Sequence, residues 1–126
     1  MRIFKNKLFA KFAKKECISD AKLCEVVRDI EAGKIDADYG CGVIKQRIAR
    51  LNEGKSGGYR AIILYRMRDK AFFVYGFPKS VQENITERDE RELKKLAKVT
   101  LAFSNNEIAK LVKIGEYEEV YCHDNE

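Results

Sequence analysis

The chain has 126 residues, of which 45% are hydrophobic and 36% charged, and it carries a formal net charge of +5. This length allows one modest core, so we expect a single domain over residues 1–126, and the ordinary composition argues against a disordered protein. No apolar run approaches the roughly 20 residues that span a bilayer, and lysines interrupt the N-terminus where a secretory signal would be apolar, so we expect a cytoplasmic protein with no membrane partner.

The first part of the chain predicts a short strand followed by two helices. The strand covers residues 1–5, and the first helix is marked by apolar residues at helical spacing, Leu8, Phe9, Phe12 and Ala13. Ser19 occupies an N-cap position and Gly33 a C-terminal stop, which together bound the second helix. We expect these helices to form a hairpin that packs on a sheet.

Residues 42–79 change to β-branched and aromatic residues with charges between them, which predicts three antiparallel strands divided at residues 52–58 and 67–70. In the middle strand, alternation places Tyr59, Ala61 and Ile63 on one face. The opposite face carries Arg60 at one end and arginines at the other, with Ile62 and Leu64 between them. This second face is therefore expected to be packed in the middle and charged at its ends.

Two helices are predicted after Pro78. Thr86 is the expected N-cap of the first, and Ser104 with Glu107 forms a capping box before the second. Gly115 ends the last helix, and residues 117–121 are either a terminal strand or part of a loose acidic tail that covers about residues 115–126. The sequence thus predicts an α+β fold, in which an N-terminal helical hairpin packs on an antiparallel sheet of about four strands with C-terminal helices.

The four cysteines could form two disulfides, but we interpret Cys17, Cys24, Cys41 and Cys122 as free thiols in a reducing cytoplasm. No pair has CxxC spacing, and the one histidine, His123, lies in the acidic tail. We therefore expect no metal site and no cofactor. A Ser–His or Cys–His nucleophile would also depend on His123, whose place in the tail makes it a poor general base.

Positive charge is concentrated in the strand region. Residues 41–80 carry nine basic and two acidic side chains, a balance of +7, whereas residues 104–126 carry two basic and six acidic ones, a balance of −4. A basic block attracts phosphate, and aromatic side chains beside it offer flat surfaces on which RNA bases stack. The alternative interpretation is a solvated charged face with tyrosines in the core.

Cleavage of RNA by its own 2′-hydroxyl needs a base, an acid for the leaving oxygen and positive charge over the phosphorane. Arginine meets the last need, because a guanidinium contacts two phosphate oxygens at once and stays charged. Without a histidine, proton transfer would use lysine, or the reaction would rely on orientation and electrostatics.

The sequence contains four informative segments: GKSGGYR at 54–60, AIILYR at 61–66, DKAFFVYGFPKS at 69–80, and ENI before ERELKKLA at 90–97. They resemble the RelE/ParE superfamily of toxins, most closely its RelE/HigB-like branch. The resemblance implies a microbial RNase-like fold and a ribosome-dependent endoribonuclease, an mRNA interferase that inhibits translation without a metal ion. It also implies a cognate antitoxin, expected to carry a helix-turn-helix domain, and contacts with mRNA in the ribosomal A site and with ribosomal RNA.

The same resemblance assigns candidate residues. Arg60 matches the arginine of the family's SGYR motif and is expected to stabilise the phosphate, and Lys79 stands where the family has a later arginine. The basic stretch 44–50 matches a strand that supplies two lysines, and residues 84–85 lie near the place of the family's C-terminal tyrosine. We expect catalysis from Arg60, Arg66, Lys79, Lys45 and Arg47, and RNA binding by Arg50, Lys55, Tyr59, Tyr65, Arg68, Tyr75 and Phe77.

Two other functions are compatible with the sequence. ParE-like members of the superfamily poison DNA gyrase and need no RNA-cutting residues, and the cations at 45, 47, 60 and 79 favour the nuclease over this alternative. A non-enzymatic RNA- or ribosome-binding module, or a plain interaction domain, would keep the basic surface without cleavage. An interaction domain would show little salt dependence of RNA binding.

Overall fold

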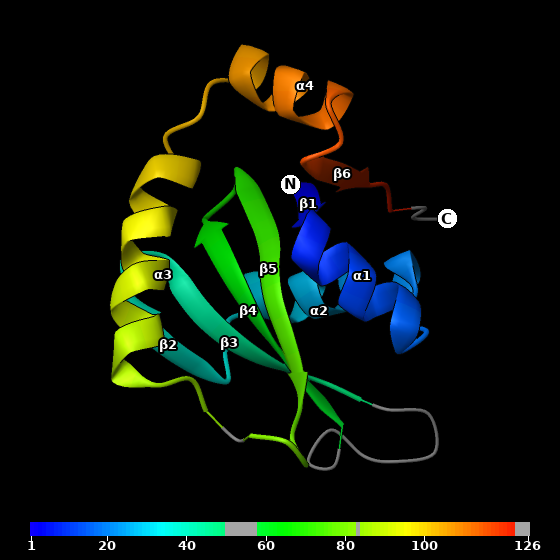
Figure 1. Ribbon diagram of the computed structural model, residues 1–126, viewed down its shortest axis with the longest axis vertical. Coiled ribbons are helices and arrows are strands. Elements are labelled where there is room, and N and C mark those ends of the chain that lie inside the picture. The colour runs from blue at the N-terminus through cyan, green and yellow to red at the C-terminus, as the bar shows by residue number, and fades with distance from the viewer. Residues whose placement is uncertain (50–57, 83, 123–126) are drawn as a thin grey trace.

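The computed structural model describes residues 1–49, 58–82 and 84–122 (Figure 1). Its elements are β1 (Arg2–Asn6), α1 (Lys7–Lys15), α2 (Asp20–Glu31), β2 (Ala37–Gly40), β3 (Val43–Ile48), β4 (Tyr59–Arg66), β5 (Lys70–Pro78), α3 (Glu87–Thr100), α4 (Asn105–Lys113) and β6 (Tyr117–Val120). The α+β class, the N-terminal helices and the C-terminal helices are confirmed.

The sheet has six strands in the order β2-β3-β4-β5-β1-β6. It is mixed, because β1 pairs in parallel with β5 while every other neighbouring pair is antiparallel. This differs from the expected antiparallel sheet of about four strands. One strand that the sequence did not predict, β2, pairs with β3. The other added pairings join β1 to β5 and to β6, and such distant partners leave no turn signal in the sequence.

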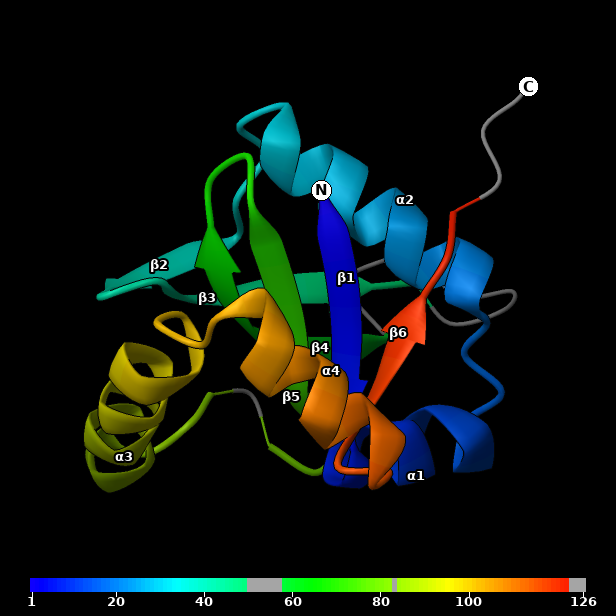
Figure 2. The ribbon, with the colours of Figure 1, turned by 90° about the horizontal axis from the view of Figure 1, so that it is seen from above.

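Helices cover both faces of the sheet, and each face has its own core (Figure 2). Between the sheet and helices α1 and α2 lie Phe9, Leu23, Val27, Ile30, Ile63 and Phe73. Between the sheet and helices α3 and α4 lie Phe4, Ile62, Leu64, Phe72, Ala97 and Ile108. The predicted division of the middle strand into two faces is therefore confirmed, because Ile62 and Leu64 enter one core and Ile63 enters the other.

The predicted helix starts are also confirmed. The Ser19 hydroxyl accepts a hydrogen bond from the Lys22 amide at 3.1 Å, and the Thr86 hydroxyl accepts one from Asp89 at 3.0 Å. Ser104 and Glu107 form both hydrogen bonds of a capping box. Each bond satisfies an amide that the first turn of a helix leaves without an intrahelical partner.

The C-terminal segment is a strand through residue 120. β6 pairs with β1, Val120 is buried, and the Glu119 carboxylate accepts two hydrogen bonds of 2.9 Å from the Arg2 guanidinium. Of the two alternatives that the sequence left open, the terminal strand is therefore the one observed. The pairing places the end of β6 beside α2.

The interpretation of all four cysteines as free thiols was wrong for two of them. Cys24 on α2 and Cys122 after β6 form a disulfide, with Cα atoms 5.8 Å apart. Cys17 and Cys41 are free and exposed. The two bonded residues are 98 positions apart in the sequence, and only the pairing of β6 with β1 brings them together.

Candidate nucleic-acid interface

Cationic and aromatic side chains form two adjacent rows across three strands of the sheet. One row joins Arg47 on β3, Arg60 on β4 and Phe77 on β5. The next row joins Lys45, Ile62 and Tyr75 on the same strands. Facing residues in antiparallel strands are about 5 Å apart and successive rows about 7 Å apart. We name Lys45, Arg47, Arg60, Tyr75 and Phe77 the basic-aromatic band.

A β-bulge in β5 puts both aromatic residues of the band on this face. The register with β4 shifts between Ile62, which faces Tyr75, and Ile63, which faces Phe73. Val74 is thus the extra residue, and Val74 and Tyr75 both contact the core on the side of α3. Without the bulge, strict alternation would turn Tyr75 and Phe77 to the face of Phe73, opposite Arg60.

Hydrogen bonds to the segment after β5 hold the row of Lys45, Ile62 and Tyr75 in place. Lys45 Nζ donates to Asn84 Oδ1, Gln82 Nε2 donates to the Asn84 carbonyl at 2.9 Å, and the Tyr75 hydroxyl donates to Gln82 Oε1 at 3.3 Å. The Tyr75 and Phe77 rings are in contact, with centroids 5.5 Å apart. Ammonium, amide and phenol groups therefore lie together on this face of the sheet.

The two arginines in the row of Arg47, Arg60 and Phe77 differ in exposure. Arg60 is 3% exposed, and its Nη1 donates to the carbonyl of Tyr59 at 3.2 Å. Arg47 is exposed and forms an ion pair with Asp36 at 3.0 Å. Arg60 is thus a buried charge that a phosphate reaches only after covering side chains shift, whereas the Arg47 guanidinium lies at the surface and is paired with Asp36.

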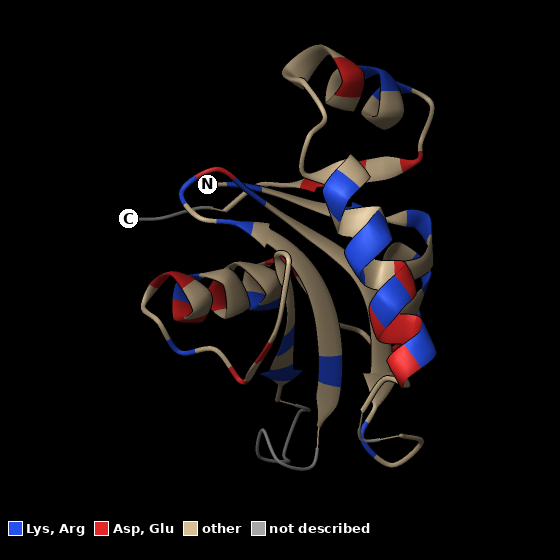
Figure 3. Ribbon diagram, turned by 90° about the vertical axis from the view of Figure 1, so that its left-hand side faces the viewer, with Lys and Arg blue, Asp and Glu red and all other residues tan. Residues whose placement is uncertain are grey.

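Lys79 lies at the same end of the sheet as Arg60. It directly follows β5, and its amide donates to the Gly58 carbonyl, just before β4, at 3.1 Å. Figure 3 shows basic segments at both ends of the sheet, and α3 carries both signs of charge. Lys79 is therefore a fourth cation at this end of the sheet, next to the three of the band.

Tyr75 also lines a hollow of about 400 Å³ between α1, β5 and α3. Leu8, Val74, Leu93 and Leu96 give it apolar walls, and Asp89 and Glu92 of α3, with Asn6, add polar atoms. The band is therefore bordered by a concave surface, as ligand sites commonly are.

Two predicted cations lie at the other end of β4. Arg66 is six residues from Arg60, about 20 Å along an extended strand. Its Nη1 donates to the Leu101 carbonyl at 3.1 Å and its Nε lies 3.9 Å from Asp69. Arg68 is in the turn between β4 and β5, with a φ of 61°. The structure does not bring Arg66 or Arg68 together with the band.

Two predicted tyrosines face the opposite side of the sheet. Tyr59 is 4% exposed, donates to Glu16 at 2.9 Å and packs against the Phe12 ring. Tyr65 packs against the same core, and burial raises its pKa. Both rings are separated by β4 from the face of Arg60, so neither extends the band. The predictions for Arg50 and Lys55 lie outside the described residues.

Sequence reasoning did not identify Asp36 or Gln82 as neighbours of the cations. Asp36 precedes β2 and meets Arg47 because β2 pairs with β3. Near it on β2, burial raises the pKa of Tyr39. A polar residue shortly after a strand is too common a signal to have singled out Gln82.

Neither a metal centre nor a membrane span is found in the part of the chain that the structure describes. Residues 1–49, 58–82 and 84–122 contain no group of three His, Cys, Asp or Glu side chains that could hold a metal ion. No helix among them has the length and apolar character needed to cross a membrane.

A protein-family model matches most of the chain. The family model described as "RelE toxin of RelE / RelB toxin-antitoxin system" matches residues 1–120. The comparison with curated proteins found no match. The family match covers all the elements described above, including the strands that carry the band.

Proposed function

The chain belongs to the RelE toxin family, the toxin component of a toxin–antitoxin system, and from this premise we propose that it is a ribosome-dependent endoribonuclease that cuts mRNA. The observation that carries the proposal is the register of the band, which joins Lys45, Arg47 and Arg60 to two aromatic rings on one face. Alternating cations and rings fit a single RNA strand, because phosphates pair with the cations while bases stack on the rings.

The proposed reaction begins when a ribose 2′-hydroxyl attacks the neighbouring phosphate. Arg60 stabilises the charge that develops on the phosphorane, and Lys45, which is held by Asn84, is the candidate base that takes the hydroxyl proton. Lys79 binds the phosphate or delivers a proton to the leaving oxygen, and Arg47 clamps the backbone. The products are a 2′,3′-cyclic phosphate and a free 5′-hydroxyl.

The burial of Arg60 supports the proposal that cleavage depends on the ribosome. Because the Arg60 residue is 3% exposed, its guanidinium meets a phosphate only when its cover is displaced. A ribosomal A site that holds the mRNA and contacts the toxin through ribosomal RNA would supply that rearrangement and the orientation of the 2′-hydroxyl. We therefore expect free RNA to be a poor substrate.

The proposed partner in the resting cell is a cognate antitoxin. The family is named for a RelE/RelB pair, and the resemblance to the HigB-like branch favours an antitoxin with a helix-turn-helix domain. An acidic or amphipathic segment of this partner would cover the cations of the band and thereby block the RNA.

The test is expression of the wild type, Arg60→Ala and Lys45→Ala in bacteria, with growth recorded and mRNA ends mapped by primer extension. Arg68→Ala is the matched control, because it removes an exposed arginine from the distant turn. We expect cuts confined to translated messages, a loss of at least about 100-fold in both band variants, and unchanged cutting in the control. Circular dichroism of the purified variants verifies that they fold.

Other results would select the alternatives. Arrested growth with intact mRNA and damaged DNA would indicate a ParE-like gyrase poison. Normal growth with ribosome binding retained would indicate a non-enzymatic binding module. Cutting that survives both Arg60→Ala and Lys45→Ala would disprove the assignment of the band.

A further inference from the structure

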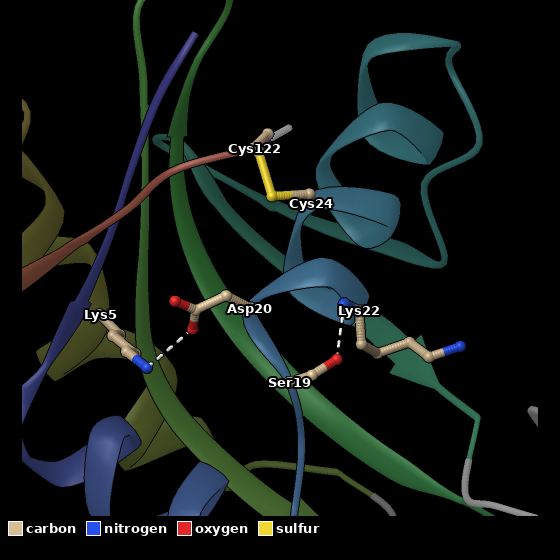
Figure 4. The surroundings of a disulfide bond; sticks show 6 residues. All are labelled: Lys5, Ser19, Asp20, Lys22, Cys24 and Cys122. Carbon is tan, nitrogen blue, oxygen red and sulfur yellow. Dashed lines mark hydrogen bonds and ion pairs between the residues drawn. A yellow bond between two sulfur atoms is a disulfide. The ribbon is translucent and has the colours of Figure 1, made fainter. Parts of the chain in front are cut away.

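A disulfide joins the last described residues to the helix on the opposite face from the band. Cys122 follows β6, and Cys24 lies on α2, 3% exposed (Figure 4). β6 is antiparallel to β1, and β1 is parallel to β5, so the end of β6 lies level with Lys70, at the start of β5. The band uses the other end of β5, so the disulfide is remote from it in both face and position.

The two bonded cysteines differ in residue exposure. Cys122 is exposed, and it opens with Cys24, Asp20, Ala21 and Tyr121 into a hollow of about 310 Å³. A thiolate from solvent can therefore approach the Cys122 sulfur, whereas the body of Cys24 is enclosed by the helix and the first core. Attack at Cys122 makes Cys24 the leaving group.

Other contacts hold the two cysteines together without the covalent bond. β6 pairs with β1 over four residues, Val120 is 4% exposed, and Glu119 makes its two hydrogen bonds to Arg2. On the α2 side, Asp20 forms an ion pair of 2.9 Å with Lys5 of β1. The Cα separation of 5.8 Å lies in the range that disulfides use. The bond can thus break and form again in the folded chain.

We propose that the Cys24–Cys122 disulfide is a reversible thiol–disulfide exchange site whose substrate is a dithiol reductant, and whose redox state sets the stability of the toxin. One thiolate of the reductant bonds to Cys122 Sγ, and the electron pair of the broken bond goes to Cys24 Sγ, which takes a proton. The second thiol of the reductant then loses its proton and displaces Cys122 as a thiolate, which takes a proton in turn. The reductant leaves as a cyclic disulfide, and the protein has gained two electrons and two protons.

The consequence is a large change in resistance to unfolding. The bond closes a loop across a sequence separation of 98. Loop-closure entropy predicts that closing such a loop lowers the equilibrium constant for unfolding by roughly three powers of ten. Reduction therefore exposes the toxin to proteolysis through transient unfolding, while the folded band keeps its geometry.

The experiment uses the full chain in buffers that contain fixed ratios of reduced and oxidised dithiothreitol. Free thiols are counted by maleimide labelling and mass spectrometry, and unfolding is followed in urea. We expect one reversible two-electron transition that adds two thiols, and an unfolding constant roughly 1,000-fold larger for the reduced protein. Cys122→Ser should match the reduced protein in every buffer, and the control Cys17→Ser should keep the transition.

Three results would overturn the proposal. Cys24 and Cys122 could remain labelled in the oxidised buffer, their reduction could require urea, or the oxidised protein and Cys122→Ser could unfold at the same urea concentration. The mRNA-cutting rate of folded protein should be equal in both redox states, because the band lies on the other face. The outcome for the disulfide is thus separate from the outcome for cleavage.

Discussion

Gly76 lies on β5 between the two aromatic residues of the band, and its own face meets helix α1. A Cβ atom built at this position would lie 2.4 Å from Cδ2 and 2.5 Å from Cε2 of Phe12, and 3.1 Å from Cε1 of Phe9. Distances under 3 Å require the ring or the strand to move. Overpacking of this kind costs about 1–3 kcal/mol, so Gly76→Ala should lower the free energy of unfolding by that amount.

The assay is urea unfolding of Gly76→Ala in the wild-type and Phe12→Ala backgrounds. Removal of the Phe12 ring removes the two shortest contacts, so the cost of Gly76→Ala should fall below about 1 kcal/mol there. Gly40→Ala is the control, because Gly40 has a φ of +89° and no atom within 4 Å of a built Cβ. Its cost arises in the backbone and should be equal in both backgrounds. An equal cost of Gly76→Ala in the two backgrounds would refute the steric argument.

Three further predictions concern the stability of the fold at acidic pH, the start of helix α4 and RNA binding by the band. The hydrogen bond from Arg2 lowers the pKa of Glu119. The ionised carboxylate therefore stabilises the fold above about pH 4.5, and this contribution is lost as the pH falls through the lowered pKa. In urea unfolding measured from about pH 6 to 3, Glu119→Gln should make the free energy of unfolding fall less steeply with pH than in the wild type. Ser104→Ala should lower the free energy of unfolding by about 1 kcal/mol, measured by urea unfolding, because a cap is lost. Tyr75→Ala should weaken binding of single-stranded RNA by about 1–3 kcal/mol in a fluorescence titration, whereas Tyr75→Phe keeps the ring and should lose far less.

Local patterns in the sequence were sufficient to predict the helices, the two faces of β4 and part of the candidate site. Each of the caps Ser19, Thr86 and Ser104 acts within three residues, so its signal is contiguous in the chain. Alternation alone placed Ile62 and Ile63 in different cores, because one strand has a fixed period of two. The family match over residues 1–120 confirms the resemblance that the segments around residues 54–80 indicated.

The tertiary structure alone decided the features that depend on pairing between distant segments. The bulge at Val74 turns Tyr75 and Phe77 to the face of Arg60, and only the register between β4 and β5 reveals it. The disulfide depends on a strand pairing that joins the two ends of the chain. The periodicity of a strand and the cap of a helix depend on residues that are close in the sequence. The register and contacts of strands that are far apart in the sequence depend on the free energy of the whole packed core, which no local pattern encodes.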